Sequence, residues 1–191
     1  MAKANGEIIV RNQTAANIFL IGFMASGKTS TGHALAARLG LPFADTDLLV
    51  EKTSGLKCAG FIERRGLKAW RRAEISALRR AARVKSRVIA LGGGILPTKA
   101  LEPLFKKNGT TVYLECGGAE LFARLAKDPA ERPLLGNDPA EKEARLYRLL
   151  KKRRPFYEKA DIKVNTAGLT PEQTAAKIAR SLKHYEKHPG R

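Results

Sequence analysis

Residues 22–29 read Gly-Phe-Met-Ala-Ser-Gly-Lys-Thr and match the phosphate-binding loop pattern G-x-x-x-x-G-K-[ST] at every fixed position. The motif follows the apolar run 17–21 and opens a segment, 29–39, whose apolar residues recur at helical spacing. In a strand, loop and helix of this kind, successive backbone N–H groups point at phosphate oxygens. This stretch therefore predicts a nucleotide-binding site and an α/β fold built around it.

Each position of the loop has its own expected task. Glycines 22 and 27 permit backbone torsions that a side chain would forbid. Lys28 is expected to reach the β- and γ-phosphates, and the Thr29 hydroxyl to ligate Mg²⁺. The alternative, an ordinary glycine-rich turn, is disfavoured by the strand before it and the helix after it. The loop residues predicted to bind ATP are Gly22, Ala25, Ser26, Gly27, Lys28, Thr29 and Ser30.

Length and composition indicate one ordinary globular domain. A chain of 191 residues is too short for two comfortable domains, and 43% hydrophobic and 28% charged residues predict folding without metals or disulfides. Cys58 and Cys116 stand in no metal-ligand pattern and are expected to be reduced packing residues. No secretory signal and no apolar run of membrane length occurs, so we expect a soluble, cytoplasmic protein. Residues 1–15 and 185–191 are predicted to be disordered tails of a domain at 16–184.

The formal charge of +18, from 36 basic and 18 acidic residues, favours anionic partners. A nucleic-acid surface would explain this charge. However, the basic residues are spread over several expected helices, and four tyrosines and one tryptophan form no base-stacking pattern. Solvated helix faces and a small anionic substrate explain the charge more simply. We therefore expect a monomer without a nucleic-acid partner.

Short apolar segments alternate along the chain with longer segments of helical period, which is typical of an α/β sandwich with a mainly parallel sheet. Thr170-Pro171 followed by Gln173 carries the signals of a helix start. The stretch 127–139 mixes proline, glycine and charge and is predicted to be a mobile loop. The expected strands are 17–21, 87–91, 110–115 and 161–165.

Two aspartates are candidates for supporting the metal and for binding a substrate hydroxyl beside the phosphates. The expected strand 87–91 ends in glycines 92–94, so the carboxylate that supports the metal must come from elsewhere. Asp45 and Asp47 lie two apart in a segment expected to be extended, which would point both side chains to one face. One could support the metal while the other accepts a hydrogen bond from a substrate hydroxyl. Alternatively, either one caps the following helix.

Glycines and charged residues further along leave two interpretations open. The triple glycine could only turn the chain, or it could let a small polar substrate lie against main-chain N–H groups. Arg71 and Glu74 share one helix face. They form either a solvated ion pair or a unit in which Glu74 orients Arg71 toward a carboxylate.

Three more arginines complete the basic candidates. Arg132, in the predicted mobile loop, could deliver positive charge to the phosphoryl group on closure. Arg153 and Arg154 are by composition most simply surface residues.

Taken in order, these motifs resemble the shikimate kinase family, small phosphate-loop enzymes of aromatic amino-acid synthesis. The resemblance spans about 17–179, and its specificity lies in the order of motifs that are weak alone. It implies a three-layer sandwich of the P-loop NTPase type, with a five-stranded parallel sheet ordered 2-3-1-4-5 and helices on both faces. The segments that carry it are 22–29, 45–47, 70–74 (Trp-Arg-Arg-Ala-Glu), 92–94, 132–135, and Arg153 with Pro155 and Tyr157.

The resemblance also implies a reaction, transfer of a phosphoryl group from ATP to the 3-hydroxyl of shikimate with Mg²⁺. It implies Lys28, Asp47 and Arg132 as catalytic residues, with Asp47 as the candidate base. Thr29 and Asp45 would hold the metal. Arg124 and Arg132 would join the loop in binding ATP. The implied shikimate-binding residues are Asp47, Arg71, Glu74, Gly93, Gly94 and Arg153.

Two departures and two competing functions accompany this prediction. Gly66-Leu67 stands where the family has Gly-Glu, and Trp70 replaces a phenylalanine, so the packing of the substrate-binding helix should differ. The competitors are a kinase for gluconate or a nucleoside monophosphate, and a nucleic-acid-binding nucleotide switch. The paired aspartates and the triple glycine argue against the first.

Overall fold

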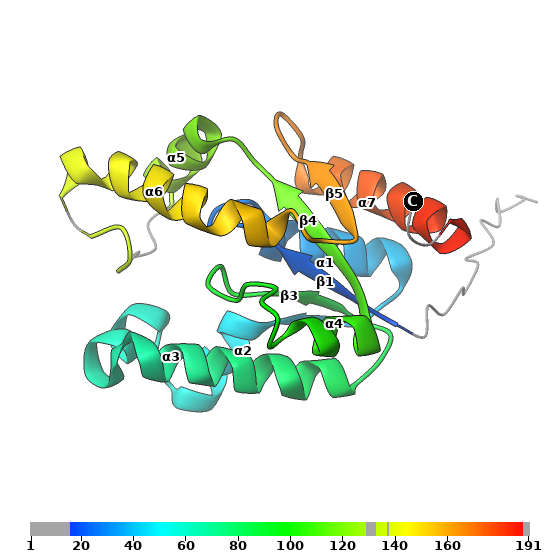
Figure 1. Cartoon of the computed structure of the whole chain (residues 1–191), viewed down its shortest axis with the longest axis horizontal. Helices are drawn as coiled ribbons and strands as arrows, with labels where there is room; N and C mark the ends of the chain where they lie inside the picture. Colours follow the sequence, from blue (N-terminus) through cyan, green and yellow to red (C-terminus); the bar gives the residue numbers. More distant parts are fainter. Residues whose placement is uncertain (1–15, 129–132, 137, 189–191) are drawn as a thin grey trace, which may run out of the picture.

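A computed structural model describes residues 16–128, 133–136 and 138–188. Its five strands form one sheet in the order β2-β3-β1-β4-β5 (Figure 1). Every neighbouring pair is parallel, which confirms the predicted fold class and strand order. The strands are β1 (Asn17–Ile21), β2 (Phe43–Asp45), β3 (Val88–Ala90), β4 (Gly109–Glu115) and β5 (Ile162–Asn165).

Helices cover both faces of this sheet because its strands are apolar on both sides. Ile18 and Leu20 of β1 pack in one core cluster with α1 and α7, whereas Phe19 and Ile21 pack in another with α3, α4 and α6. No described helix is both long and apolar enough to cross a membrane. The helices are α1 (Lys28–Leu39), α2 (Thr46–Ser54), α3 (Cys58–Arg83), α4 (Glu102–Asn108), α5 (Gly118–Ala126), α6 (Pro139–Tyr157) and α7 (Pro171–Lys187).

The region after β2 differs from the prediction of a single extended segment. β2 ends at Asp45 and α2 begins at Thr46, so Asp47 lies in the first helical turn. Asp45 is the N-cap, and its Oδ1 accepts hydrogen bonds from the backbone N–H groups of Asp47, at 2.9 Å, and Leu48, at 3.4 Å. A carboxylate at this position satisfies N–H groups that lack an intrahelical partner, so it favours the turn into a helix over further extension.

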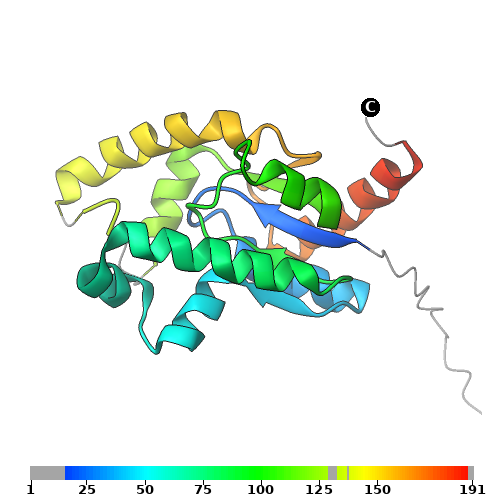
Figure 2. The same cartoon turned by 60° about the horizontal axis from the view of Figure 1, so that its bottom comes forward.

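Helices α2 and α3 lie side by side near the β2 edge of the sheet (Figures 1 and 2). They share a small core of Val50, Phe61, Trp70 and Ala77. α3 is kinked at Gly66, whose φ of 79° and ψ of 158° lie outside the helical region. The kink separates the first two turns of α3 from the long part that packs against the sheet.

The C-terminal end is ordered further than predicted. α7 starts with the expected capping box, since Thr170 Oγ1 accepts from Gln173 N and Gln173 Oε1 accepts from Thr170 N. The helix continues to Lys187, so the predicted disordered tail at 185–191 starts too early. The Tyr185 ring packs against the core, and its hydroxyl donates to Asp161 Oδ1 at 3.3 Å, which stabilises this last turn. The N-terminal tail predicted at 1–15 lies outside the described residues.

Candidate active site

The loop between β1 and α1 has the backbone of an anion cradle. Gly22, Ala25 and Gly27 have positive φ angles of 149°, 59° and 86°. A Cβ on Gly22 would lie 2.8 Å from the Leu114 carbonyl oxygen and 2.9 Å from Ser26 Oγ, so only glycine fits there. Turns of this kind direct successive N–H groups inward, as phosphate binding requires.

Lys28 and Thr29 leave this loop at the start of α1. The Lys28 ammonium donates to the carbonyl oxygens of Gly22, at 3.0 Å, and Phe23, at 2.7 Å, which folds the side chain back over the loop. The Thr29 hydroxyl donates to Asp45 Oδ2 at 2.7 Å. Asp45 thus caps α2 with one carboxylate oxygen and accepts a hydrogen bond from Thr29 of the phosphate loop with the other.

The pair Thr29 and Asp45 fits Mg²⁺. Magnesium in nucleotide sites prefers oxygen ligands, usually one or two from the protein, and takes the rest from phosphates and water. A hydroxyl and a carboxylate in contact beside the loop supply that donor set. Among the described residues no group of three or more His, Cys, Asp or Glu could form an all-protein metal cage.

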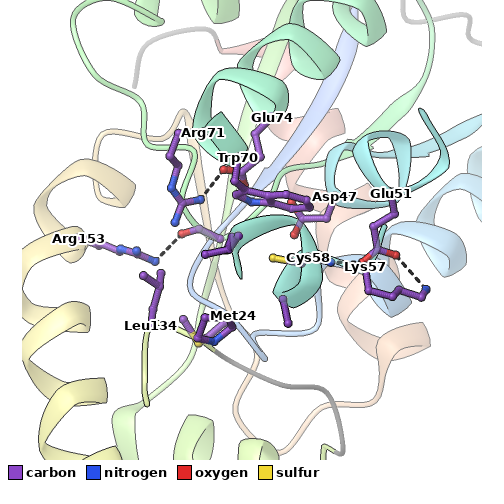
Figure 3. Close-up of a pocket in the computed structure, with 15 residues that line it drawn as sticks. Met24, Asp47, Glu51, Lys57, Cys58, Trp70, Arg71, Glu74, Leu134 and Arg153 are labelled. Atoms are coloured by element: carbon purple, nitrogen blue, oxygen red, sulfur yellow. Dashed lines mark hydrogen bonds and ion pairs between the residues drawn. The ribbon is translucent and has the colours of Figure 1, made fainter. Parts of the chain in front are cut away.

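A cavity of about 530 Å³ lies between α2, α3, the glycines after β3 and α6 (Figure 3). All of the residues predicted to bind the acceptor line it: Asp47, Arg71, Glu74, Gly93, Gly94 and Arg153. In Figure 3, Arg71 and Arg153 lie on one side of this cavity, and Glu51 and Lys57 on the other. The tertiary structure thus brings together residues from four separate segments of the chain.

Arg71 and Glu74 form an ion pair that is buried at its carboxylate end, whereas the Arg71 side chain is partly exposed. The Glu74 side chain is only 1% exposed, and its Oε2 accepts from Arg71 Nη1. A carboxylate this deeply buried must be paired, so it holds the guanidinium in one orientation at the cavity wall. The interpretation in which Glu74 orients Arg71 is therefore the one that the geometry favours.

Close approach explains the triple glycine. A Cβ on Gly94 would lie 1.7 Å from Arg71 Nη1, and one on Gly92 would lie 2.2 Å from both Asp47 Oδ1 and Glu74 Oε1. These side chains occupy the space that larger residues would fill. Glycines after β3 therefore let the charged groups of α2 and α3 pack directly against the backbone.

Asp47 has the most perturbed environment of these carboxylates. Its Oδ1 is buried without a hydrogen-bond partner. Burial, followed by the negative charges of Glu74 and Asp45, raises the pKa of Asp47 to about 8 against the opposing charge of Lys28. A carboxylate in this setting has a proton affinity suited to exchange with a substrate hydroxyl near neutral pH.

Two side chains of α6, Arg153 and Tyr157, hold the glycine segment 92–94 in place. Arg153 Nη1 and the Tyr157 hydroxyl both donate to the Gly93 carbonyl oxygen, at 2.8 Å and 2.9 Å. Arg153 is 8% exposed, so the interpretation as a surface residue is wrong for it, whereas the Arg154 side chain is 54% exposed. Tyr157 was expected only as part of a motif, although its position one turn after Arg153 places both on one helix face.

A second cavity, of about 390 Å³, adjoins the other side of the phosphate loop. Arg124 lines it and is held in place by Glu120, by the Ala25 carbonyl at 3.3 Å and by the Thr166 carbonyl at 3.4 Å. A third cavity, of about 400 Å³, is lined by Lys28, Thr29, Asp45 and Asp47 and shares residues with both neighbours. The three cavities therefore lie next to one another around the loop.

Some features of the site could not be read from the sequence. Met24, Ile62 and Trp70 line the acceptor cavity, and so does Cys58, which was expected only to pack. Burial raises the pKa of the Cys58 thiol to about 12, so it is an unreactive wall residue. Arg132 lies outside the described residues, but the adjacent Pro133 and Leu134 line the acceptor cavity.

Comparisons with known proteins agree with this arrangement. The sequence model of the family "Shikimate kinase" matches residues 24–183. A shikimate kinase of Thermodesulfovibrio yellowstonii is 39% identical over 171 residues, which cover 90% of this chain and 95% of the relative. The solved shikimate kinase of Acinetobacter baumannii in complex with shikimate superposes with a TM-score of 0.84 at 31% identity, covering 91% of this chain and 96% of that one. The Aquifex aeolicus shikimate kinase gives 0.77 at 34% identity, covering 91% and 99%.

Proposed function

Because this chain belongs to the shikimate kinase family, we propose that its cavities hold ATP and shikimate on opposite sides of the phosphate loop. The reaction is transfer of the γ-phosphoryl group of ATP to the 3-hydroxyl of shikimate. The observation that carries the residue assignments is that every described residue expected to bind the acceptor lines a single cavity.

On the nucleotide side, the loop amides grip the phosphates and the Lys28 ammonium exchanges its carbonyl contacts for the β- and γ-phosphates. Arg124 flanks the adenine. Thr29 and Asp45 hold Mg²⁺, which neutralises phosphate charge when bound. Arg132 contributes a further positive charge to the transferred group.

On the acceptor side, the guanidinium groups of Arg71 and Arg153 bind the shikimate carboxylate, since a planar fork suits bidentate contact. Asp47 accepts the hydrogen bond of the 3-hydroxyl and takes its proton as the oxygen attacks. A bond forms between that oxygen and the γ-phosphorus, the bond to the β,γ-bridging oxygen breaks, and ADP leaves. Most of the catalysis is positioning and charge stabilisation.

Measurement of ADP release with shikimate, gluconate and nucleoside monophosphates, each at the same ATP and Mg²⁺ concentrations, tests this function. Of these three acceptors, we expect only shikimate to support ADP release. Turnover with only gluconate or a nucleotide would reject the proposal. Calorimetry of ADP binding with and without chelation of Mg²⁺ tests the metal assignment, and Thr29→Ala should reduce the difference between the two affinities.

We further propose that small anions, and not nucleic acids, account for the positive charge of +18. Binding to duplex and single-stranded DNA should be weak at physiological salt, because the charge is spread over solvated helices. Tight DNA binding together with no turnover of shikimate would favour the nucleotide-switch alternative.

A further inference from the structure

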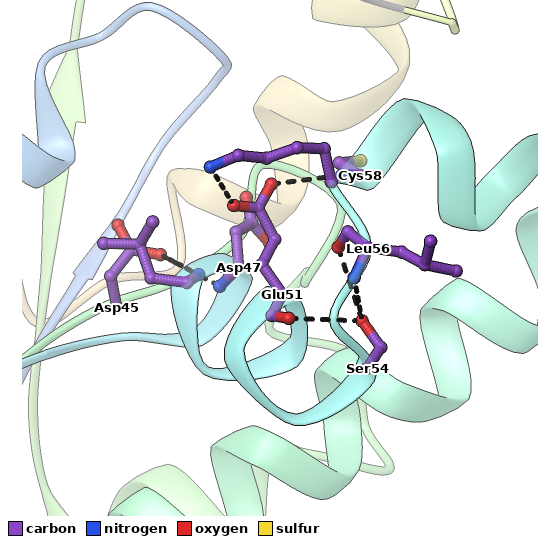
Figure 4. A network of polar contacts seen from close by, with 8 residues as sticks. Asp45, Asp47, Glu51, Ser54, Leu56 and Cys58 are labelled. Atoms are coloured by element: carbon purple, nitrogen blue, oxygen red, sulfur yellow. Dashed lines mark hydrogen bonds and ion pairs between the residues drawn. The ribbon is translucent and has the colours of Figure 1, made fainter.

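Glu51 joins the two helices that form the acceptor cavity (Figure 4). It lies on α2 one turn after Asp47, with a side chain that is 18% exposed. Its Oε1 accepts from the backbone N–H of Cys58, the first residue of α3, at 3.0 Å. Its Oε2 accepts from the Lys57 ammonium at 2.9 Å. One carboxylate thus contacts the beginning of the neighbouring helix through two donors.

This contact compensates for an unfavourable helix start. The N-cap residue of α3 is Lys57, whose side chain has no acceptor atom and makes no capping hydrogen bond. The first N–H groups of a helix need acceptors, and a negative charge there interacts favourably with the helix dipole. Glu51 provides both from a different helix, so the cap of α3 is also a link to α2.

The link has a consequence for the acceptor site, because the two helices carry different parts of it. α2 carries Asp47, and α3 carries Arg71 and Glu74. α2 is only nine residues long and is fixed at its beginning by the Asp45 cap. Near its end, Val50 packs against the apolar side chains of α3, and Glu51 adds a polar contact to the beginning of α3. Ser54 Oγ, which accepts from Leu56 N at 3.2 Å, closes the short connection.

We propose that Glu51 is a positioning residue that fixes Asp47 of α2 relative to Arg71 and Glu74 of α3. The role rests on the proposed function of these residues in binding shikimate. It requires no contact between Glu51 and the reacting atoms. Its effect should appear in acceptor binding and turnover and not in ATP binding, because the nucleotide cavity is lined by other elements.

The test compares Glu51→Ala, Glu51→Gln and the double variant Glu51→Ala/Lys57→Ser, with Lys57→Ser as its background. Exposed Lys52→Ala on the same helix is the matched control. Glu51→Ala should raise the shikimate KM on the order of tenfold with an unchanged ATP KM, since small misplacements of a site are costly. Glu51→Gln keeps an oxygen acceptor for Cys58 N–H and should retain most of the acceptor affinity.

The double variant separates positioning from helix stability. Serine at position 57 is a good N-cap and should restore the thermal stability lost in Glu51→Ala. Because it makes no link to α2, the shikimate KM should stay high. Recovery of both the thermal stability and the shikimate KM in the double variant would overturn the proposal. An equal loss of shikimate affinity in Glu51→Gln and Glu51→Ala would also overturn it. If the wild-type protein shows no shikimate-dependent ADP release, the proposed function is rejected. If the wild type is active and the Glu51 variants keep its shikimate KM, only the role of Glu51 is rejected.

Discussion

The Arg71 guanidinium is fixed by two neighbours of very different kinds. On one side is the buried Glu74 carboxylate, and on the other is the backbone of Gly94, which leaves just enough room for it. A residue held in this way loses little further side-chain entropy when it binds an anion. The acceptor site should therefore be sensitive to changes at both neighbours.

Arg71→Ala removes the proposed ligand of the shikimate carboxylate. Hydrogen bonds to charged groups contribute about 1.5–3 kcal/mol, so the shikimate KM should rise about 10- to 100-fold. The ATP KM should change little, because Arg71 does not line the nucleotide cavity. Steady-state kinetics with each substrate varied checks this, and the adjacent exposed Arg72→Ala is the control. An unchanged shikimate KM in Arg71→Ala would contradict the assigned role.

Gly94→Ala tests the same site from the backbone side. The added methyl group would overlap Arg71 Nη1, which lies at the end of a flexible side chain and can move away. We expect weaker shikimate binding and a lower melting temperature, because displacement of the Arg71 guanidinium leaves the buried Glu74 carboxylate without its partner. Gly60→Ala, where the methyl group meets no atom within 4 Å, serves as the control. A large loss of stability in Gly94→Ala, with shikimate affinity retained, would show that the glycine only serves the turn.

At the scale of single elements, α3 departs from a regular helix at two places. It starts at a lysine N-cap and is kinked at Gly66. Trp70 stands where the resemblance leads one to expect phenylalanine. Its side chain is 2% exposed and packs edge-on against Phe61, with ring centroids 5.4 Å apart. The tryptophan therefore joins the part of α3 before the kink to the part after it.

The kink gives opposite expectations for two glycines of the same helix. Gly66 has a backbone conformation that is almost restricted to glycine, so Gly66→Ala should cost about 1–3 kcal/mol or straighten the helix. Gly60 has no positive φ, so Gly60→Ala should stabilise α3 by about 0.5 kcal/mol. Thermal denaturation measures both, and each kcal/mol corresponds to about 2–4 °C for a chain of this size. Equal effects of the two substitutions would show that the kink is not needed.

At the scale of the whole molecule, the site exists because the sheet is parallel. The phosphate loop follows β1, Asp45 ends β2 and the glycines 92–94 follow β3, and in a parallel sheet these ends lie at one edge. Ligands of open α/β sheets bind at this edge, where the strand order changes direction from β1 to its two neighbours. The arrangement places the residues proposed to bind the metal, the phosphates and the acceptor within reach of one another.

The charge of +18 should make the stability of the molecule depend on salt. Self-repulsion destabilises a compact state that is far from neutral. Raising NaCl from about 0.01 M to about 0.15 M shortens the screening length from about 30 Å to about 8 Å, so the melting temperature should rise. Differential scanning calorimetry at pH 7 in the absence of nucleotide checks this. A fall in melting temperature would instead indicate that attractive ion pairs dominate the surface.

The sequence by itself determined the parallel sheet and the phosphate-loop motif, and it pointed to residues that line one cavity, because these depend on local patterns and on a distinctive order of motifs. Asp45 shows where local reasoning left two interpretations open: alternation predicted an extended segment through Asp47, helix capping was the alternative, and the Asp45 carboxylate caps a helix there. Local spacing also did not reveal that Tyr157 binds the Gly93 carbonyl or that Cys58 lines the cavity.

Only the tertiary structure decided between the interpretations that the residues left open. It buried the Glu74 carboxylate, packed Arg71 against Gly94, and turned Glu51 into the cap of a helix other than its own. The physical reason is that burial, close approach and capping between helices depend on contacts between segments far apart in the chain or on different elements. Hydrophobic periodicity and motif spacing describe neighbours along the chain, and so they carry no information about these contacts.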